Sequence, residues 1–314
     1  MITAVELGLI YAVMALGVYL TFRVLEFPDL TVDGSFATGA AVSAVMILGG
    51  VNPFLAIITS FFAGAAAGLI TGLLNTKGHI DGLLAGILTQ VALYSINLRI
   101  MGTSNLGLLR AVTVFTPLRE GGILGTWLGP GIMTPLVLLI VGLLVWFLHT
   151  NVGLALRASG DAPAMARSFG VSTDAQKILG LALSNGMVAT SGSLIAQYQG
   201  FADVGMGIGI IVAGLASVII GQAIIGRLTI LRSAFAVALG AVIYRVVIQL
   251  ALMLGFDPND MKLISAIIVV IALLVPQWRL GTRMRHLMGS KKPTSDEKLT
   301  GRLVMENAAL DGEE

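Results

Sequence analysis

Few residue types in this sequence could do covalent or metal chemistry, and those present are not clustered. The three histidines, His79, His149 and His286, lie far apart, and cysteine is absent. The sequence contains no H-E-x-x-H zinc motif, no G-x-S-x-G nucleophile turn and no G-x-x-x-x-G-K-[ST] phosphate loop. These absences disfavour an enzymatic function. They also disfavour binding of ATP phosphates by such a loop of this chain. We expect no cofactor, no metal and no nucleic-acid partner.

Polar side chains inside long apolar runs are the other residues with chemical potential. Such groups are costly in lipid, so they face a cavity or another helix. Gln90 and Asn97 are two helical turns apart, with Tyr94 between them, and Arg245 and Gln249 are one turn apart. A sparse and mostly uncharged lining suits a zwitterionic solute, although hydrogen bonds that only hold helices together would use the same residue types. The candidate path residues are Asp33, Gln90, Tyr94, Asn97, Asn185, Arg245 and Gln249.

Arg245 is the most unusual of these residues. An arginine at membrane depth requires a carboxylate, carbonyl oxygens or water around its guanidinium. A functional role and a structural ion pair are equally open for it, with Glu6 as a candidate partner.

The composition shows which solvent these residues must sit in. Of 314 residues, 56% are hydrophobic and only 11% are charged, and the mean hydropathy is +0.92. Soluble domains carry about 25% charged residues. Lipid must therefore solvate most of this chain, which we predict to be an integral membrane protein.

Apolar runs long enough to span a bilayer predict an all-α polytopic bundle. Because every backbone polar group must be paired inside lipid, these runs are expected to be helices. We predict about nine spans, within a range of eight to ten, and the second and seventh are glycine-rich enough to be broken or re-entrant. Glycines spaced four apart, such as Gly64, Gly68 and Gly72, favour close helix packing. The predicted spans are near residues 4–22, 31–50, 53–75, 81–101, 131–149, 177–199, 204–224, 233–254 and 262–279.

Basic residues predict the orientation of these spans. With nine spans and a cytoplasmic C-terminus, most of the 19 lysines and arginines fall on the cytoplasmic side. The N-terminus is then outside, as is the long segment 102–130. We therefore expect a transmembrane domain over residues 1–280, with a cytoplasmic loop at 150–176, and a polar cytoplasmic tail over 281–314.

The loop at 150–176 contains the stretch LRASGDAPAMARSFGVSTD, residues 156–174, which predicts a short helix outside the bilayer. Asp161 is expected to cap its start and Pro163 to lie in its first turn, with the helix continuing to Phe169. Gly170 then ends the helix, because glycine tolerates a positive φ. Thr173 and Gln176 have the spacing of a capping box that opens the next span.

An apolar pair on this helix predicts a partner surface. Met165 and Phe169 are one turn apart and share a face, while Arg167 points elsewhere. The pair would dock on another protein or rest on lipid headgroups as an interfacial helix, and the pattern alone favours neither.

The stretch NVGLALRASGDAPAMARSFGV resembles the cytoplasmic coupling loop of ATP-binding-cassette importer permeases of the branched-chain amino acid type. The stretch RVLEFPDLTVDGSFATGA, residues 23–40, is also similar to that family, and the resemblance extends over most of residues 4–280. The runs 29–34 and 94–102 look like a subgroup that imports aromatic amino acids or related small solutes. The residues that the resemblance assigns to coupling with an ATPase are Arg157, Ala158, Gly160, Asp161, Ala164, Met165, Ala166, Phe169 and Gly170.

This resemblance implies a permease subunit in a bacterial cytoplasmic membrane. Its expected partners are a separate ATP-binding subunit, an extracytoplasmic solute-binding protein and a second permease copy, with a homodimer favoured. The main alternative is a secondary transporter driven by an ion gradient, which would use intramembrane carboxylates or broken helices to coordinate the ion. Glu6 is the clearest acidic residue within a predicted span, which weakens that alternative.

Overall fold

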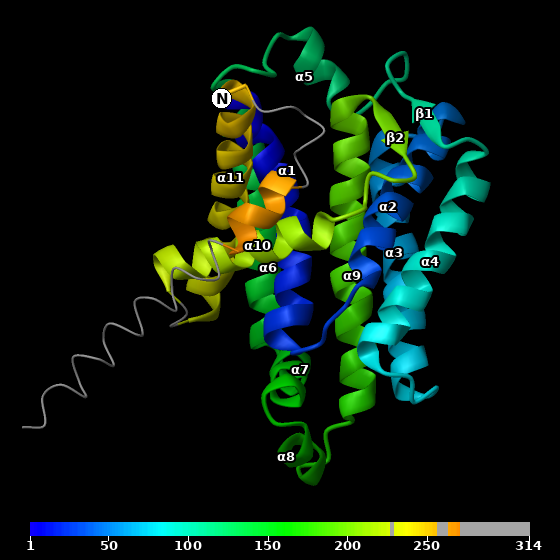
Figure 1. Cartoon of the computed structure of the whole chain (residues 1–314), viewed down its shortest axis with the longest axis vertical. Coiled ribbons are helices and arrows are strands. Elements are labelled where there is room, and N and C mark those ends of the chain that lie inside the picture. The colour runs from blue at the N-terminus through cyan, green and yellow to red at the C-terminus, as the bar shows by residue number, and fades with distance from the viewer. Residues whose placement is uncertain (227–228, 256–262, 271–314) are drawn as a thin grey trace, which may run out of the picture. The chain divides into compact units, whose positions relative to one another are not determined.

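A computed structural model describes residues 1–226, 229–255 and 263–270. Seven helices in these residues are long and apolar enough to cross a membrane. Figure 1 shows most of them running side by side along the long axis. Their bounds are α1 Ile2–Tyr19, which continues as a π-helical turn to Val24, α2 Thr31–Leu48, α3 Pro53–Thr76, α4 Gly82–Met101, α6 Leu128–His149, α9 Thr173–Gln199 and α11 Ile230–Met253.

The shorter elements lie at the ends of this bundle or across it. Strands β1, Asn105–Gly107, and β2, Phe201–Asp203, pair antiparallel, and with helix α5, Thr116–Glu120, they lie at one end. Helices α7, Asn151–Asp161, and α8, Pro163–Ser168, project from the other end (Figure 1). The 102–130 and 150–176 segments therefore lie at opposite ends, as expected for loops on opposite sides of a bilayer.

Helix α10, Ile210–Ile225, differs from the spanning helix expected near 204–224. Its 16 residues extend about 24 Å, which is less than the ~30 Å hydrocarbon core. In Figure 1 it runs across the long helices rather than along them. The prediction of a broken or re-entrant seventh segment agrees with this helix, whereas the second segment is one continuous helix, α2.

The expected count of nine spans is not reproduced in the described residues. The ninth span falls largely outside them, since only 263–270 of that segment are described, as helix. The predicted tail over 281–314 also lies outside the described residues.

Small residues allow helix α9 to sit at the centre of the bundle, against α1, α2 and α3. A Cβ at Gly68 of α3 would collide with the Leu181 carbonyl of α9, and one at Gly39 of α2 would collide with the Ala189 carbonyl. The expected close approach at Gly64, Gly68 and Gly72 is therefore observed, because all three face α9.

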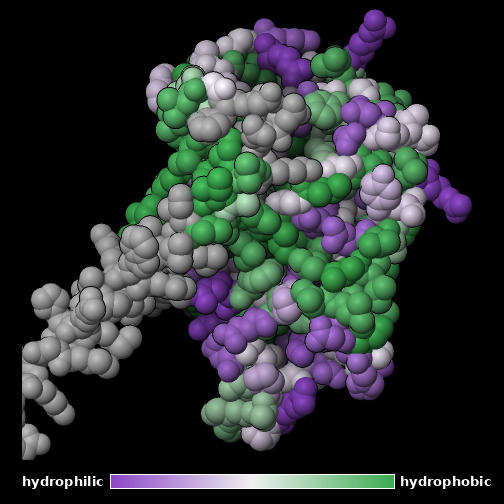
Figure 2. Space-filling model, in the orientation of Figure 1, coloured by the Kyte–Doolittle hydropathy of each residue, from purple (hydrophilic) through white to green (hydrophobic). Residues whose placement is uncertain are grey.

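The outer surface of the long helices is apolar, as lipid requires. Large hydrophobic side chains such as Phe62, Val91 and Leu139 are exposed on α3, α4 and α6. Figure 2 shows hydrophobic residues over much of the middle of one face and hydrophilic residues gathered toward its ends.

Candidate functional site

The projecting segment is built from two helices rather than the single two-turn helix expected from the sequence. Asp161 is the last residue of α7 and caps no helix start. Ala162 breaks the path with φ −147° and ψ 77°, and Pro163 opens α8 at a position where its missing N–H costs nothing. The stretch NVGLALRASGD forms α7 because its eleven residues contain no proline. The prediction that a helix starts at Asp161 overlooked this.

The end of α8 and the start of α9 agree only partly with the prediction. Gly170 has φ +82° and ends the segment as expected. Ser172, not Thr173, caps α9, accepting a hydrogen bond from the Ala175 N–H at 3.4 Å. Thr173 cannot serve as the cap, because it begins the helix and its hydroxyl accepts from Arg167 Nε at 2.7 Å. The N-cap was thus predicted one residue too late, and the predicted capping box is wrong, because Ala175 lies where the box requires Glu or Gln.

The tip of this segment exposes an apolar pair. Met165 is 60% exposed and Phe169 is 75% exposed. Arg167 turns back toward the bundle, bonding Thr173 and lying 3.9 Å from the Asp174 carboxylate. The predicted division between an apolar face and Arg167 is therefore present.

The base of the segment is packed tightly on the bundle. A Cβ at Gly160 would collide with the Val24 carbonyl at the end of α1, and Leu156 is fully buried. Ala166 of α8 is buried, whereas Ala158, Asp161 and Ala164 are exposed and Arg157 is half-buried. A displacement of the tip would consequently reach α1 and α9 through rigid contacts.

A cavity of about 290 Å³ between α2, α4 and the 204–208 segment brings together four of the seven candidate path residues. We call it the α2–α4 cavity. Its polar lining includes Asp33, Gln90, Tyr94, Ser95 and Asn97. The helical spacing that grouped the three α4 residues therefore predicted one wall of a cavity correctly.

Two polar groups at this cavity have distinct roles. The Asp33 carboxylate accepts hydrogen bonds from the backbone N–H groups of Gly209 and Ile211, at 2.9 and 2.8 Å, which holds the start of α10. Asn97 is fully buried, and its Oδ1 accepts no hydrogen bond from any described residue, while its Nδ2 lies 3.5 Å from the Gly34 carbonyl. A buried acceptor without a partner is unusual, because most buried polar atoms in proteins are hydrogen-bonded.

A second cavity, of about 270 Å³, surrounds Arg245 and includes Tyr11, Gly209 and Tyr244 in its lining. We call it the Arg245 cavity. The Arg245 guanidinium lies 4.3 Å from the centre of the Tyr11 ring, and its Nε bonds to no described residue. Ile208 lines both cavities and thus stands between them.

The suggested pairing of Arg245 with Glu6 is wrong. The Glu6 carboxylate accepts from the Tyr198 hydroxyl at 2.6 Å and from the Gly125 N–H at 3.0 Å. On α1, Glu6 lies about one and a half turns from Tyr11 toward the β1–β2 end. Its partners there are Tyr198, at the end of α9, and Gly125, in the connection after α5.

Asn185 and Gln249 lie outside both cavities. Asn185 is fully buried and donates to Asp29 Oδ2 at 2.7 Å, while it accepts from the Ser35 hydroxyl at 2.7 Å. Gln249 is half-buried on α11 and lines neither cavity. For Asn185, the alternative interpretation of a hydrogen bond that holds helices together agrees with the structure.

Asp29 organises this buried network, although no individual role was predicted for it from the sequence. It lies between the first two spanning helices, is fully buried, and also accepts from the Thr31 N–H at 2.9 Å. Burial raises the pKa of its carboxyl, while the hydrogen bonds from Thr31 and Asn185 lower it. An acidic residue in the short turn between two apolar runs of a charge-poor chain was the signal that could have identified it.

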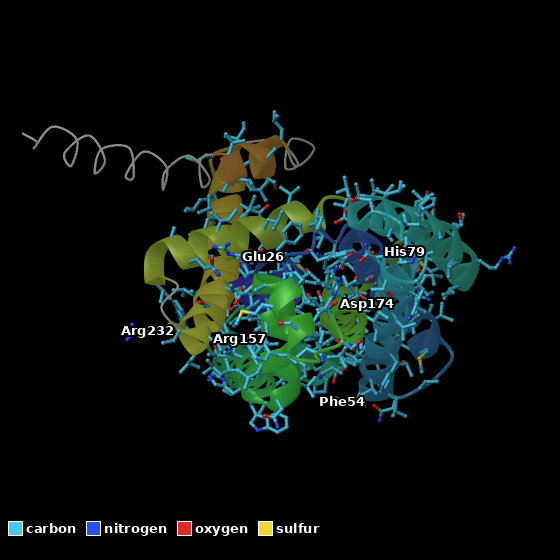
Figure 3. The ribbon with its side chains drawn as sticks, turned by 90° about the horizontal axis from the view of Figure 1, so that it is seen from below. Glu26, Phe54, His79, Arg157, Asp174 and Arg232 are labelled. Atoms are coloured by element: carbon cyan, nitrogen blue, oxygen red, sulfur yellow. The ribbon has the colours of Figure 1, made fainter. Side chains whose placement is uncertain are left out.

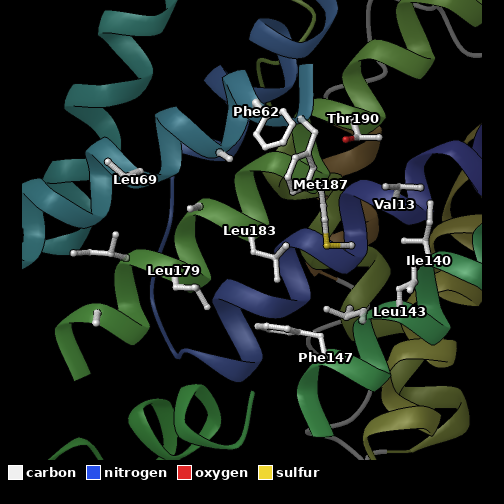
Figure 4. Close-up of a pocket in the computed structure, with 16 residues that line it drawn as sticks. Val13, Phe62, Leu69, Ile140, Leu143, Phe147, Leu179, Leu183, Met187 and Thr190 are labelled. Carbon is white, nitrogen blue, oxygen red and sulfur yellow. The ribbon is translucent and has the colours of Figure 1, made fainter. Parts of the chain in front are cut away.

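A larger cavity of about 790 Å³ lies between α1, α3, α6 and α9 and is lined almost wholly by apolar side chains. Figure 4 shows Phe62, Leu143, Phe147 and Met187 around it. Thr190 is its one polar side chain, and its hydroxyl already donates to the Gly186 carbonyl. Such a lining offers nothing to the charged ends of a zwitterion.

Comparison with known proteins supports a transport role for this architecture. Residues 1–274 match the family described as the permease component of the branched-chain amino acid transport system. The tyrosine transport system permease protein of Clostridioides difficile (strain R20291) is 41% identical over 275 residues, covering 86% of this chain and 88% of the relative. The ribose import permease protein of Escherichia coli (strain K12) is 25% identical, covering 84% and 81% respectively.

A solved structure shares the fold. It is described as a metal-chelate type ABC transporter in an inward-facing conformation, and it superposes with a TM-score of 0.52 over 88% of this chain and 85% of its own. The sequences are 14% identical, so this similarity concerns the fold alone.

Proposed function

Because the chain belongs to the family of permease components of branched-chain amino acid transport systems, we propose that it forms the translocation path of an ATP-driven importer for a small solute, an amino acid. Two copies of the chain enclose the path, a separate subunit hydrolyses ATP, and an extracytoplasmic binding protein delivers the solute. The protein lies in a bacterial cytoplasmic membrane with its N-terminus outside and its C-terminus in the cytoplasm. The observation that carries this proposal is the family match, which spans the whole described bundle.

The exposed tip at Met165 and Phe169 is the docking point for the ATP-binding subunit. Two large apolar side chains on a short helix outside the bilayer gain free energy by burial in a groove of a partner. The contacts of Gly160 with Val24 and of Arg167 with Asp174 then pass movement of the ATPase to α1 and α9.

An amino acid with an aromatic side chain is the favoured solute. The Arg245 guanidinium can bind a carboxylate, and the rings of Tyr11 and Tyr244 offer apolar surface beside it. The α2–α4 cavity lies on the other side of Ile208 and offers a second polar position along the path, lined by Asp33, Gln90 and Asn97. The name of the relative from Clostridioides difficile, a tyrosine permease, agrees with this assignment.

Reconstitution in proteoliposomes tests the proposal. The permease is purified with its ATP-binding subunit and its binding protein, and uptake of labelled tyrosine and leucine is measured with and without internal ATP. We expect uptake only with ATP and both partners. Uptake by the permease alone, driven by a proton or sodium gradient, would instead establish a secondary transporter.

A further inference from the structure

A polar cavity of about 440 Å³ lies at the end of the bundle from which α7 and α8 project. We call it the basic cavity. It is formed where four helices meet: the end of α1, the end of α6, the last turns of α7 and the start of α11. Its charged lining consists of Arg23, Arg157 and Asp161, and His149 borders it.

The two arginines have donors to spare. Arg23 uses its Nε to donate to Gln222 at 3.2 Å, which leaves its two terminal nitrogens available. Within the described ranges, Arg157 makes no hydrogen bond, and no carboxylate lies within 4.0 Å of its guanidinium. The one ion pair in these ranges joins Arg167 and Asp174. A guanidinium fork without a carboxylate partner is suited to bind phosphate oxygens.

Neutral donors complete the lining. The hydroxyl-bearing residues Tyr19, Thr229 and Ser233 also line the cavity. Thr229 caps α11, so the positive end of that 24-residue helix also lies at this cavity. Asp161 subtracts one charge, so the lining carries a formal net charge of about +1, which matches a phosphodiester better than a doubly charged phosphate.

The surroundings of the cavity are those of a membrane–water boundary. Trp146, one turn before His149 on α6, is 68% exposed, and tryptophan is enriched at such boundaries. Leu231 and Phe235, in the first two turns of α11, are also exposed. Acyl chains can therefore lie along α6 and α11 while a headgroup occupies the polar cavity.

We propose that the basic cavity binds the phosphodiester headgroup of an anionic phospholipid, held mainly by Arg23 and Arg157. Because Arg157 and Asp161 belong to α7, the bound lipid joins the projecting segment to α1, α6 and α11. Basic cavities between membrane helices are known places for anionic headgroups. The site is independent of the identity of the transported solute.

Lipid binding to the purified full-length chain tests the site directly. In neutral detergent, native mass spectrometry and thermal unfolding compare phosphatidylglycerol with phosphatidylcholine of the same acyl chains. We expect phosphatidylglycerol to bind about tenfold more tightly, and Arg157→Gln and Arg23→Gln each to abolish most of that preference. Arg157→Lys, which keeps the charge but loses the fork, should retain part of it.

Arg232→Gln is the matched control. Arg232 is exposed in the first turn of α11 at the same end of the bundle but does not line the cavity. Figure 3, viewed from this end, shows Arg157 near the middle and Arg232 at the margin. The control should keep the full preference for phosphatidylglycerol.

Three results would overturn the proposal. Equal binding of the two lipids would remove the headgroup specificity. Equal losses in Arg157→Gln and Arg232→Gln would show general surface attraction. Competition by glycerol phosphate or inorganic phosphate at the same concentration as the lipid would indicate a site for a soluble phosphate. The comparison requires that the variants, without added lipid, have the same unfolding temperature as the wild type.

Discussion

The buried polar side chains of this protein are of two chemical kinds. Asn185, Asp29 and Ser35 use one another's donors and acceptors, and such groups hold helices together. Asn97 and Arg245 each keep one buried atom without a partner among the described residues, and both border a cavity. We infer that the second kind is available to a solute, whereas the first kind maintains the bundle.

Replacing Asn185 should therefore affect stability first. Asn185→Leu removes the donor to Asp29 and the acceptor for Ser35, both deep in the bundle. We expect a loss of about 2–4 kcal/mol in the free energy of unfolding, measured as a lowered unfolding temperature in detergent. Thr190→Val on the same helix is the control, because the Thr190 hydroxyl donates only to its own helix. Equal stability of the two variants would contradict the network.

Replacing Arg245 should affect uptake first. Arg245→Gln removes the cation above Tyr11 and should raise the KM for a carboxylate-bearing solute about tenfold or more. Arg245→Lys should give an intermediate KM, while Arg232→Gln, an exposed arginine on the same helix, should not change it. An unchanged KM in Arg245→Gln at normal expression would exclude this carboxylate contact.

At the scale of elements, the projecting helices join a free tip to a fixed base. Met165 of α8 and Phe169 directly after α8 are exposed, while Gly160 of α7 is packed against Val24. A tip that only rested on lipid would tolerate many apolar or charged replacements, whereas a docking surface would not.

Charge at the tip should uncouple ATP hydrolysis from uptake. Phe169→Asp places a carboxylate in the apolar contact that we assign to the ATP-binding subunit. In the reconstituted importer we expect uptake to fall at least about tenfold while ATPase activity of the complex loses its stimulation by the loaded binding protein. Ser168→Asp is the control, because Ser168 is exposed beside Phe169 and donates only to the Met165 carbonyl. Normal uptake in Phe169→Asp would contradict the docking assignment.

Close packing of α3 on α9 should depend on glycine at particular positions. Gly68→Ala introduces a methyl group against the Leu181 carbonyl and should cost about 1–3 kcal/mol in the free energy of unfolding. Gly142→Ala on α6, where nothing lies within 4 Å of the added Cβ, should be neutral or slightly stabilising. Thermal unfolding of the two variants compares them, and a stable Gly68→Ala variant would show that the helices can separate at no cost.

At the scale of the whole molecule, a single chain provides only part of the lining of a translocation path and does not enclose it. The α2–α4 cavity and the Arg245 cavity lie on either side of Ile208, and Asp33 holds the crosswise helix α10 where the two meet. The surfaces of α3, α4 and α6 are largely apolar and exposed. A second copy of the chain would cover part of this surface and close the path.

The assembled importer should therefore contain two permease chains. We expect native mass spectrometry of the complex, purified with its ATP-binding subunit, to give two copies of this chain and two ATPase subunits. Two different permease chains would instead indicate a heterodimer, and a single copy would contradict an enclosed path between two permeases.

The sequence determined the solvent of this protein, the all-α bundle, the glycine contacts and the exposed pair at Met165 and Phe169. These features depend on hydropathy and on spacings within one helix, which local sequence records directly. Local sequence also placed Gln90, Tyr94 and Asn97 on one face of α4.

Only the tertiary structure decided which polar residues meet. It paired Asp33 with the start of α10, Asn185 with Asp29, and Glu6 with Tyr198, all of them far apart along the chain. It also showed that the seventh segment, expected to span the membrane, is the crosswise helix α10. Contacts of this kind depend on how the helices pack around α9. The hydrophobic pattern of a helix specifies which of its faces is buried, but not which neighbouring helix covers that face.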